Sequence, residues 1–498
     1  MTVHDLCEKV RAVNATGKYK ANWNSLCAHP APQWFRRSKF GIFIHWGVFS
    51  VPAAFSEWYP RHMYREGSPE HEDFRRRFGD MKHFGYKDLI PMFTAPNFDA
   101  EAWMRLFREA GARYVTPVAE HHDGFQMYRS ELSRWNSAEM GPKRDVLGEL
   151  KAAAEREGLI LCASSHRAEH YWFMNGGRTF DSDVNDPAYD DFYGPAIYND
   201  DLKDPGPKNM YSVGIRSPRM REHLDNWLAR CAELIDNYRP AMLYFDWWIA
   251  NEAFRPYLKE LAAYYYNRAE EWGTEVTICY KHNTFPLDAA TFDVERGQLS
   301  GIRMRPWQTD TAIAVNSWCY TQNNIFKRAQ DIVADLVDIV SKNGNLMLNV
   351  GPRADGTICE EEANVLRAVG EWMRVNGEAI YDTLPWKVFG EGPTKIADGQ
   401  FTDTARGAFT AQDIRYTCKG DALYIFVLHA ADGIREIALR ALAEGEQQAG
   451  EAVLAESAVV LGDPDNAVTI LPGKDAMRLT LARPVVSEYP VCIRLRVK

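Results

Sequence analysis

The segment FDAEAWMRLFREAGARYVTPVAEHHDGF, residues 98–125, decides the fold that we expect for this chain. Its first half has a helix pattern: Asp99 is placed to cap the N-terminus, and large apolar residues such as Trp103 recur at intervals of three and four. Gly111 suits the end of a helix, and the apolar run at 114–119 then predicts a buried strand. Helix–strand units of this kind build parallel sheets.

The same alternation recurs along the first three quarters of the chain. A helix predicted at 146–157 leads through Gly158 into a strand at 159–164. Further strands are predicted at 40–46, 242–246, 276–280, 291–295, 312–320 and 345–350, and further helices at 221–237, 252–272, 324–341 and 360–375. Eight strands separated by helices predict an α/β fold of the (β/α)8 TIM-like barrel type. An open doubly wound sheet is the alternative, but no GxGxxG motif follows the first strand.

The sequence changes character after Gly377. The segment GEAIYDTLPWKVFGEGPT, residues 377–394, is rich in glycine and proline and predicts a connector. Short alternating strands are then predicted at 413–418, 423–428, 458–461, 477–481 and 491–497. We therefore expect a (β/α)8 catalytic domain at 1–385 and an all-β sandwich domain at 386–498.

Composition and charge argue against several classes of function. The net charge of −10, with no block of basic residues, is unlike that of nucleic-acid-binding proteins. No apolar run approaches the roughly 20 residues of a membrane-spanning helix, and the N-terminus lacks a signal-peptide pattern. The cysteines are scattered and never in CxxC spacing, which favours reduced thiols. We expect a cytoplasmic protein that binds neither nucleic acid nor membranes, and the sequence leaves a homo-oligomer open.

Candidate functional residues follow the predicted strands. In a (β/α)8 barrel the C-terminal ends of the strands meet at one rim, where active sites lie. The residues at or just after these ends are His45 and Trp46; Glu120, His121, His122 and Asp123; Ser165 and His166; Asp246; Tyr280, Lys281 and His282; Asp293 and Glu295; and Trp318. So many polar and aromatic side chains converging from separate strands predict a site rather than core packing.

One chemistry open to this set is metal-assisted hydrolysis. His45, His121, His122 and Asp246 are residue types that zinc accepts as ligands. Against this interpretation, the side chains of adjacent histidines diverge in an extended segment. The chain also has no HxH or HExxH motif.

The second chemistry is glycoside hydrolysis by two carboxyl groups, one a nucleophile and the other a proton donor. Asp246 ends the apolar run at 241–245 and precedes two tryptophans, so it suits the role of nucleophile at a strand end. Glu295 suits the role of proton donor, with Asp293 and Glu57 as rivals. Histidines then hydrogen-bond sugar hydroxyls, and no metal is needed.

Five long motifs resemble the α-L-fucosidases of glycoside hydrolase family 29. They are KFGIFIHWGVFSVPAAFSEWY (39–59), HHDGFQMYRS (121–130), LYFDWW (243–248), SKNGNLMLNVGPRADGTI (341–358) and GEAIYDT (377–383). They stand in the family's order and span nearly the whole predicted barrel. The C-terminal β region also agrees with the accessory sandwich usual in that family.

The resemblance implies roles for the matching residues. Asp246 takes the place of the family nucleophile, and the positions that match sugar contacts are His45, His121, His122, Glu57, Trp58 and Trp318. We also expect His166 and Tyr280, at strand ends, to bind substrate, and we assign the acid/base to Glu295 from strand order. The implied reaction is retaining hydrolysis of terminal α-L-fucosyl linkages in fucosylated oligosaccharides, with no cofactor and no metal. Its two carboxyl groups should lie about 5–5.5 Å apart.

Several positions depart from the family pattern. Glu120 stands where lysine often precedes HHDGF, Cys319 where glycine is usual, and Gln308 where many relatives have glutamate. An arginine often follows the fifth strand in the family, and here Lys281 or His282 takes that place.

Two other functions remain compatible with the sequence. One is a retaining glycosidase for a related sugar such as an α-L-galactoside, and the other is a catalytically silent fucose-binding protein, from which loss of Asp246 would be expected. Fucose carries a methyl group at C5, which needs a small apolar pocket. The candidates for lining that pocket are Phe40, Phe43, Phe125 and Phe292.

Overall fold

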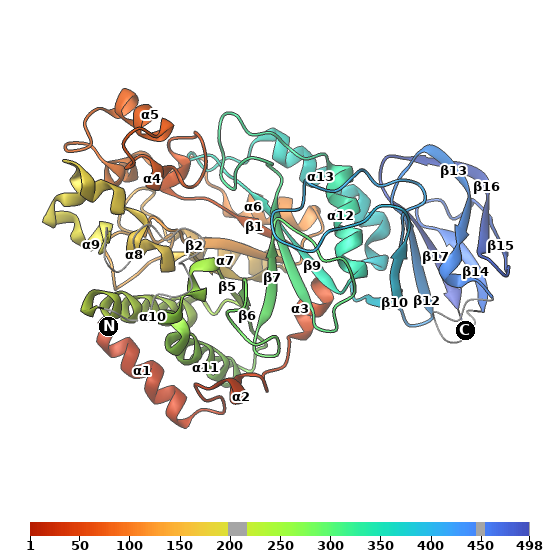
Figure 1. Cartoon of the computed structure of the whole chain (residues 1–498), viewed down its shortest axis with the longest axis horizontal. Coiled ribbons are helices and arrows are strands. Elements are labelled where there is room, and N and C mark those ends of the chain that lie inside the picture. The colour runs from red at the N-terminus through yellow and green to blue at the C-terminus, as the bar shows by residue number, and fades with distance from the viewer. Residues whose placement is uncertain (198–216, 445–453, 498) are drawn as a thin grey trace.

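The computed structural model of the chain describes residues 1–197, 217–444 and 454–497, which form a barrel followed by two β-sheets (Figure 1). The barrel strands are β1 Phe40–Ile44, β2 Tyr114–Glu120, β3 Ile160–Leu161 with β4 Ala163–Ser165, β5 Met242–Phe245, β6 Thr277–Tyr280, β7 Thr291–Glu295, β8 Trp307–Ala312 and β9 Gly344–Val350. All neighbours pair in parallel, and β1 pairs with both β9 and β2, which closes the sheet. Both β3 and β4 pair with β2, so they share one position in the wall. The predicted (β/α)8 barrel is confirmed.

The strand at the seventh wall position differs from the one predicted. We predicted a strand at 312–320, but the strand is Trp307–Ala312. Its alternating residues Gln308 and Asp310 are polar and point into the barrel, where Tyr114 donates a 2.8 Å hydrogen bond to Gln308. The apolar pattern that usually marks a buried strand is therefore missing here.

The helices surround the barrel, as Figure 1 shows. The cap predicted at Asp99 forms, because its side chain accepts hydrogen bonds from the amides of Glu101 and Ala102. The longer helices are α1 Val3–Thr16, α5 Pro69–Phe78, α6 Ala100–Glu109, α7 Val146–Glu157, α10 Pro218–Tyr238, α11 Arg255–Trp272, α12 Ala329–Ser341 and α13 Glu360–Asn376. The short helices are α2 Trp23–Leu26, α3 Gln33–Ser38, α4 Tyr59–His62, α8 His170–Phe173 and α9 Asp190–Tyr193. No helix in the described ranges combines the length and apolar character needed to cross a bilayer.

The C-terminal region is a β-sandwich, as predicted. Its strands are β10 Leu384–Glu391, β11 Ile414–Lys419, β12 Ala422–Val427, β13 Ala430–Leu439, β14 Ala455–Val460, β15 Val468–Leu471, β16 Met477–Ser487 and β17 Val491–Val497. They form one antiparallel sheet in the order β10-β11-β12-β17-β14 and another in the order β13-β16-β15. One apolar core, including Ile425 and Leu479, lies between the sheets. Part of the predicted connector is strand β10, and the predicted domain boundary after residue 385 falls within it.

A buried ion cluster joins the sandwich to the barrel. Asp338 on α12 lies 2.5 Å from Lys342 on one side and 2.5 Å from Arg415 of β11 on the other. All three side chains are buried, so each charge depends on its partners. This contact fixes the C-terminal region against the outer helices of the barrel. It thereby also fixes the position of the loops of the C-terminal region relative to the barrel.

Candidate active site

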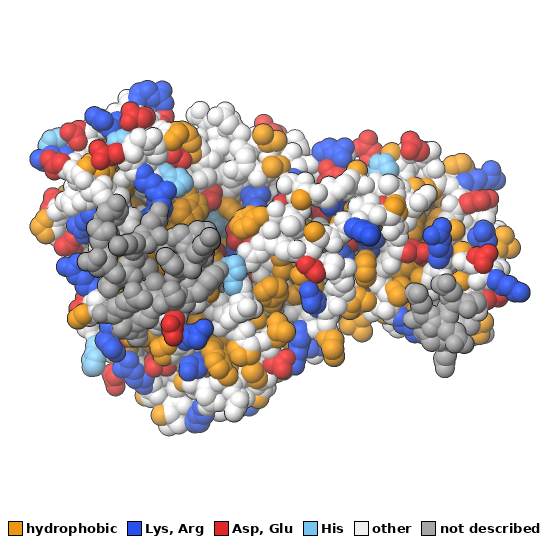
Figure 2. Space-filling view, in the orientation of Figure 1, with side chains coloured by type: hydrophobic (Ala, Val, Ile, Leu, Met, Phe, Trp, Pro, Cys, Tyr) orange, Lys and Arg blue, Asp and Glu red, His pale blue; other side chains and the backbone are white. Residues whose placement is uncertain are grey.

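A cavity of about 400 Å³ opens at the C-terminal ends of the barrel strands. Its lining residues are Phe43, His45, Glu57, Trp58, His121, His122, His166, Tyr244, Asp246, Trp247, Lys281, His282, Glu295, Asp310, Trp318, Gln400 and Phe401. Nine of the ten side chains predicted for the site are among them, Tyr280 being the exception. Figure 2 shows a hollow near the middle of the barrel region with hydrophobic and histidine side chains in it. A larger groove of about 860 Å³ lies elsewhere, between α6 and α13, away from these strand ends.

Asp246 lies directly after β5 and is held as a carboxylate. Its Oδ1 accepts the amide of Trp247 at 2.8 Å and lies 3.2 Å from the Lys281 ammonium, while Oδ2 lies 3.4 Å from His166 Nδ1. Burial by itself raises the pKa of this carboxyl, but Lys281 and then His166 hold the pKa well below its ordinary value. Asp246 is therefore ionised and points into the cavity, as a nucleophile must.

Glu295 ends β7 and differs from Asp246 in its protonation. Its Oε2 lies 2.6 Å from the same Lys281 ammonium. Burial raises its pKa to about 7, the Lys281 charge opposes that rise, and the Asp246 charge adds to it. At neutral pH a large fraction of Glu295 therefore carries a proton that it can donate.

The two other candidates for the proton donor, Asp293 and Glu57, are hydrogen-bonded in ways that do not suit that role. Asp293 does not line the cavity: it is fully buried and accepts a 2.7 Å hydrogen bond from Gln308. Burial and then the charge of Asp310 raise its pKa well above the ordinary value. Glu57 does line the cavity, but it accepts the amide of Trp318 at 3.1 Å and so holds that loop in place.

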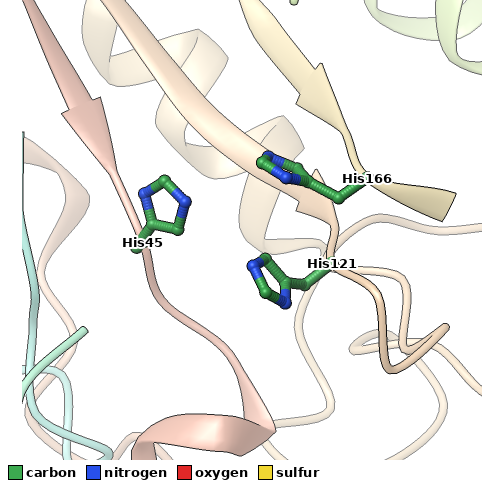
Figure 3. A group of neighbouring side chains, drawn as sticks. All are labelled: His45, His121 and His166. Carbon is green, nitrogen blue, oxygen red and sulfur yellow. The ribbon is translucent and has the colours of Figure 1, made fainter. Parts of the chain in front are cut away.

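Three histidines from separate strand ends face one another in the cavity. Figure 3 shows the rings of His45, His121 and His166 converging, and one ring nitrogen of each lies within 4.8 Å of the others. Burial lowers the pKa of all three, so they are neutral and suit either sugar hydroxyls or a metal ion. Asn349 fixes His45 through a 2.7 Å contact to Nδ1.

His122 belongs to the same cavity, which corrects one expectation. We expected its side chain to diverge from that of His121, yet the two ring centroids lie 4.2 Å apart. The chain leaves the extended conformation after Glu120 and turns at once, so the strand rule no longer applies. Burial lowers the pKa of His122, but the Glu169 carboxylate, 3.1 Å away, outweighs this and raises it overall.

Tyr280 was predicted to bind substrate and does not face the cavity. Successive side chains of a strand point to opposite sides. Cys279 of β6 packs inside the barrel against Met242, so Tyr280 points outward onto Phe285 and Phe292. Of the four phenylalanines suggested for a methyl pocket, only Phe43 is among the lining residues.

Sequence reasoning missed several residues of the site. Asp310 was not predicted because its strand, Trp307–Ala312, was predicted at 312–320 instead. Asp310 accepts a 2.7 Å hydrogen bond from Tyr244 and lies 3.8 Å from Lys281. Gln400 and Phe401 come from the C-terminal region, where no strand end pointed to them. Among the departures from the family pattern, Glu120 lies outside the cavity, bonded to two buried arginines at 2.9 Å each.

Comparisons with known proteins give one consistent result. The family model described as alpha-L-fucosidase matches residues 6–378. Human tissue alpha-L-fucosidase is 30% identical over 442 residues, which cover 85% of this chain and 81% of that protein. Human plasma alpha-L-fucosidase is 31% identical over 390 residues, covering 74% and 73%. The crystal structure of Thermotoga maritima alpha-fucosidase has 26% identity and a TM-score of 0.71, covering 96% of this chain and all of that one. That enzyme has also been solved with fucose and with a mechanism-based inhibitor.

Proposed function

Since this chain belongs to the α-L-fucosidase family of glycoside hydrolases, we propose that it removes terminal α-L-fucosyl residues from oligosaccharides by a retaining, double-displacement reaction. Asp246 is the nucleophile and Glu295 the acid/base. The observation that carries the proposal is the single ammonium of Lys281, which contacts both carboxyl groups.

In the first step Asp246 attacks the anomeric carbon of the fucosyl residue. The glycosidic bond breaks, and Glu295 gives its proton to the departing oxygen. In the second step Glu295, now a carboxylate, takes a proton from water, and the hydroxide attacks the same carbon. The bond to Asp246 breaks, fucose leaves, and both carboxyl groups return to their starting states.

Two features of the site support retention rather than inversion. Because Asp246 and Glu295 contact one ammonium at 3.2 and 2.6 Å, their nearest oxygens lie at most about 6 Å apart, which suits the 5–5.5 Å of retaining enzymes better than the 6.5–9.5 Å of inverting ones. Their pKa values are also displaced in opposite directions, as a nucleophile and a proton donor require.

The neutral histidines His45, His121 and His166 fit the hydroxyl groups of fucose, and the ring of Phe43 fits its methyl group. Fucose is also the sugar found in the Thermotoga maritima complex. All nine cysteines of the chain are free, which supports a reducing, cytoplasmic location.

The test is release of nitrophenol from an aryl α-L-fucoside by the wild type and by Asp246→Asn, each assayed with and without a chelator. We expect wild-type turnover that the chelator leaves unchanged and that the substitution lowers by several orders of magnitude. Chelator-sensitive turnover would instead assign His45, His121 and His166 to a metal ion. Full activity in the variant would exclude Asp246 as the nucleophile. Wild-type turnover of an aryl α-L-galactoside, but not of the fucoside, would favour the related-sugar alternative.

A further inference from the structure

A segment of the C-terminal region, residues 398–403, crosses to the rim of the barrel beside Glu295. It belongs to the loop between β10 and β11, which Figure 1 shows reaching from the sandwich over the barrel. The amide of Phe401 donates to the carbonyl oxygen of Glu295 at 2.8 Å, and the amide of Asp403 to that of Arg296 at 2.9 Å. The main chain next to the acid/base is thus bonded to this crossing segment.

Both ends of the crossing segment are anchored. Asp403 is half-buried, lies 2.6 Å from the Lys327 ammonium and accepts a 2.6 Å hydrogen bond from Thr311. At the other end Asp398 accepts hydrogen bonds from the amide and the hydroxyl of Ser300, at 2.5 and 2.8 Å. A loop held by charged and backbone contacts at both ends presents its middle residues in a fixed place.

Phe401, in the middle of this segment, is exposed although it is a large apolar residue. It lines the cavity with 62% of its surface accessible, and its backbone has a φ of 56°, which non-glycine residues adopt rarely. Such backbone conformations persist where the surrounding contacts enforce them, and they cluster at functional sites. Gln400 lies next to it on the cavity wall and adds a polar group with both donor and acceptor atoms.

We propose that Phe401 and Gln400 form the subsite for the leaving group, a neutral sugar residue to which the fucose is attached. This inference rests on the proposed function, because the proton donor must lie beside the glycosidic oxygen and the leaving group is bonded to that oxygen. The Phe401 ring packs on the apolar face of this second sugar, and the Gln400 amide hydrogen-bonds one of its hydroxyls. Both residues lie beyond residues 6–378, the part that matches the family model, so this subsite belongs to the C-terminal region of this chain.

The experiment compares two substrates that differ only in the leaving group: α-L-fucosyl fluoride, which carries no second sugar, and a fucosyl disaccharide. Phe401→Ala should lower kcat/KM for the disaccharide roughly 2- to 13-fold, the effect of losing one aromatic contact, and leave kcat/KM for the fluoride unchanged. Phe401→Tyr should keep both rates. Val486→Ala, at another exposed apolar residue (70% accessible) on β16, is the matched control and should change neither.

Three results with the variant would overturn the subsite and leave the proposed function standing. Equal rates for Phe401→Ala and wild type on the disaccharide would show that the ring contacts no leaving group. Equal losses on both substrates would place the ring against the fucose instead. A shift of the basic limb of the pH profile would mean that Phe401 acts through Glu295, although its amide contact survives the substitution. Wild-type enzyme that hydrolyses neither substrate would refute the proposed function itself, and the subsite with it.

Discussion

Replacing Lys281 by methionine should move both limbs of the pH–rate profile in the same direction. The Lys281 ammonium lies 3.2 Å from Asp246 Oδ1 and 2.6 Å from Glu295 Oε2, and its charge lowers the pKa of both carboxyl groups. Removing it raises both pKa values. The acid limb, where Asp246 loses its charge, and the basic limb, where Glu295 loses its proton, therefore both shift to higher pH.

The size of the effect follows from the two hydrogen bonds that the substitution removes. A hydrogen bond to a charged group contributes about 1.5–3 kcal/mol, and Asp246 and Glu295 each lose one. If the loss on Asp246 appears in full in the transition state, kcat/KM near pH 7 falls about 10- to 160-fold, since each 1.36 kcal/mol is a factor of ten. Part of this activity should return at higher pH, where Asp246 ionises again.

The assay is kcat/KM for an aryl α-L-fucoside from about pH 4 to 10, with circular dichroism at each pH to confirm folding. Lys281→Arg keeps the charge and should leave the limbs near their wild-type places. Lys342→Met removes another buried lysine, 2.5 Å from Asp338 and outside the cavity, and should lower stability without moving either limb. If Lys281→Met lowers the maximum kcat/KM but leaves both limbs of the pH–rate profile at their wild-type pH, the reasoning is refuted, because Lys281 would then not act through the two carboxyl groups.

Three further results are expected. Glu295→Gln should lower kcat/KM for a fucosyl disaccharide by about 10²–10⁴ but affect α-L-fucosyl fluoride far less, and equal losses would contradict its role as proton donor. In the wild type the disaccharide rate should fall above about pH 7, because Glu295, whose raised pKa keeps it protonated up to about 7, then loses its proton. Asp338→Asn should lower the free energy of unfolding in urea by about 3–5 kcal/mol because it leaves two buried cations without their counter-charge, whereas Asp331→Asn at a surface pair should change it by less than about 1 kcal/mol.

The parts of the fold that could be predicted carry local signals. Helix α7 lies where it was predicted, at 146–157, because Asp145 caps its start and Gly158, with a φ of 69°, ends it. Strand β8 gave no such signal. Its inward-facing Gln308 and Asp310 are stabilised by hydrogen bonds from tyrosines of other strands, which a single sequence does not reveal.

For the site, the strand-end rule found both carboxyl groups, Lys281 and the histidines, whereas Glu57 and Trp58 came from the motif resemblance and Asp310 was missed. The rule did not reveal which of these side chains contact one another. It placed Lys281 at the rim, but it could not show that the Lys281 ammonium contacts both carboxyl groups. It also failed for Tyr280, whose direction depends on the register of β6. The rule could not identify Phe401, which lies in the loop between β10 and β11 and not at a barrel strand end. The position of this loop depends on contacts such as that of Asp403 with Lys327, 76 residues apart.

The two carboxyl groups take different roles although they contact one cation. What separates them is the number of other donors. Asp246 also accepts the amide of Trp247 and faces His166, and hydrogen bonds to a carboxylate favour its charged form. Glu295 has the closer contact to Lys281, yet burial and the charge of Asp246 still raise its pKa. Burial, with the charge of Asp246 added to it, thus keeps the proton on Glu295. Once Asp246 is bonded to the fucosyl carbon it loses that charge, the repulsion disappears, and the pKa of Glu295 should fall, which makes Glu295 the base that the second step requires.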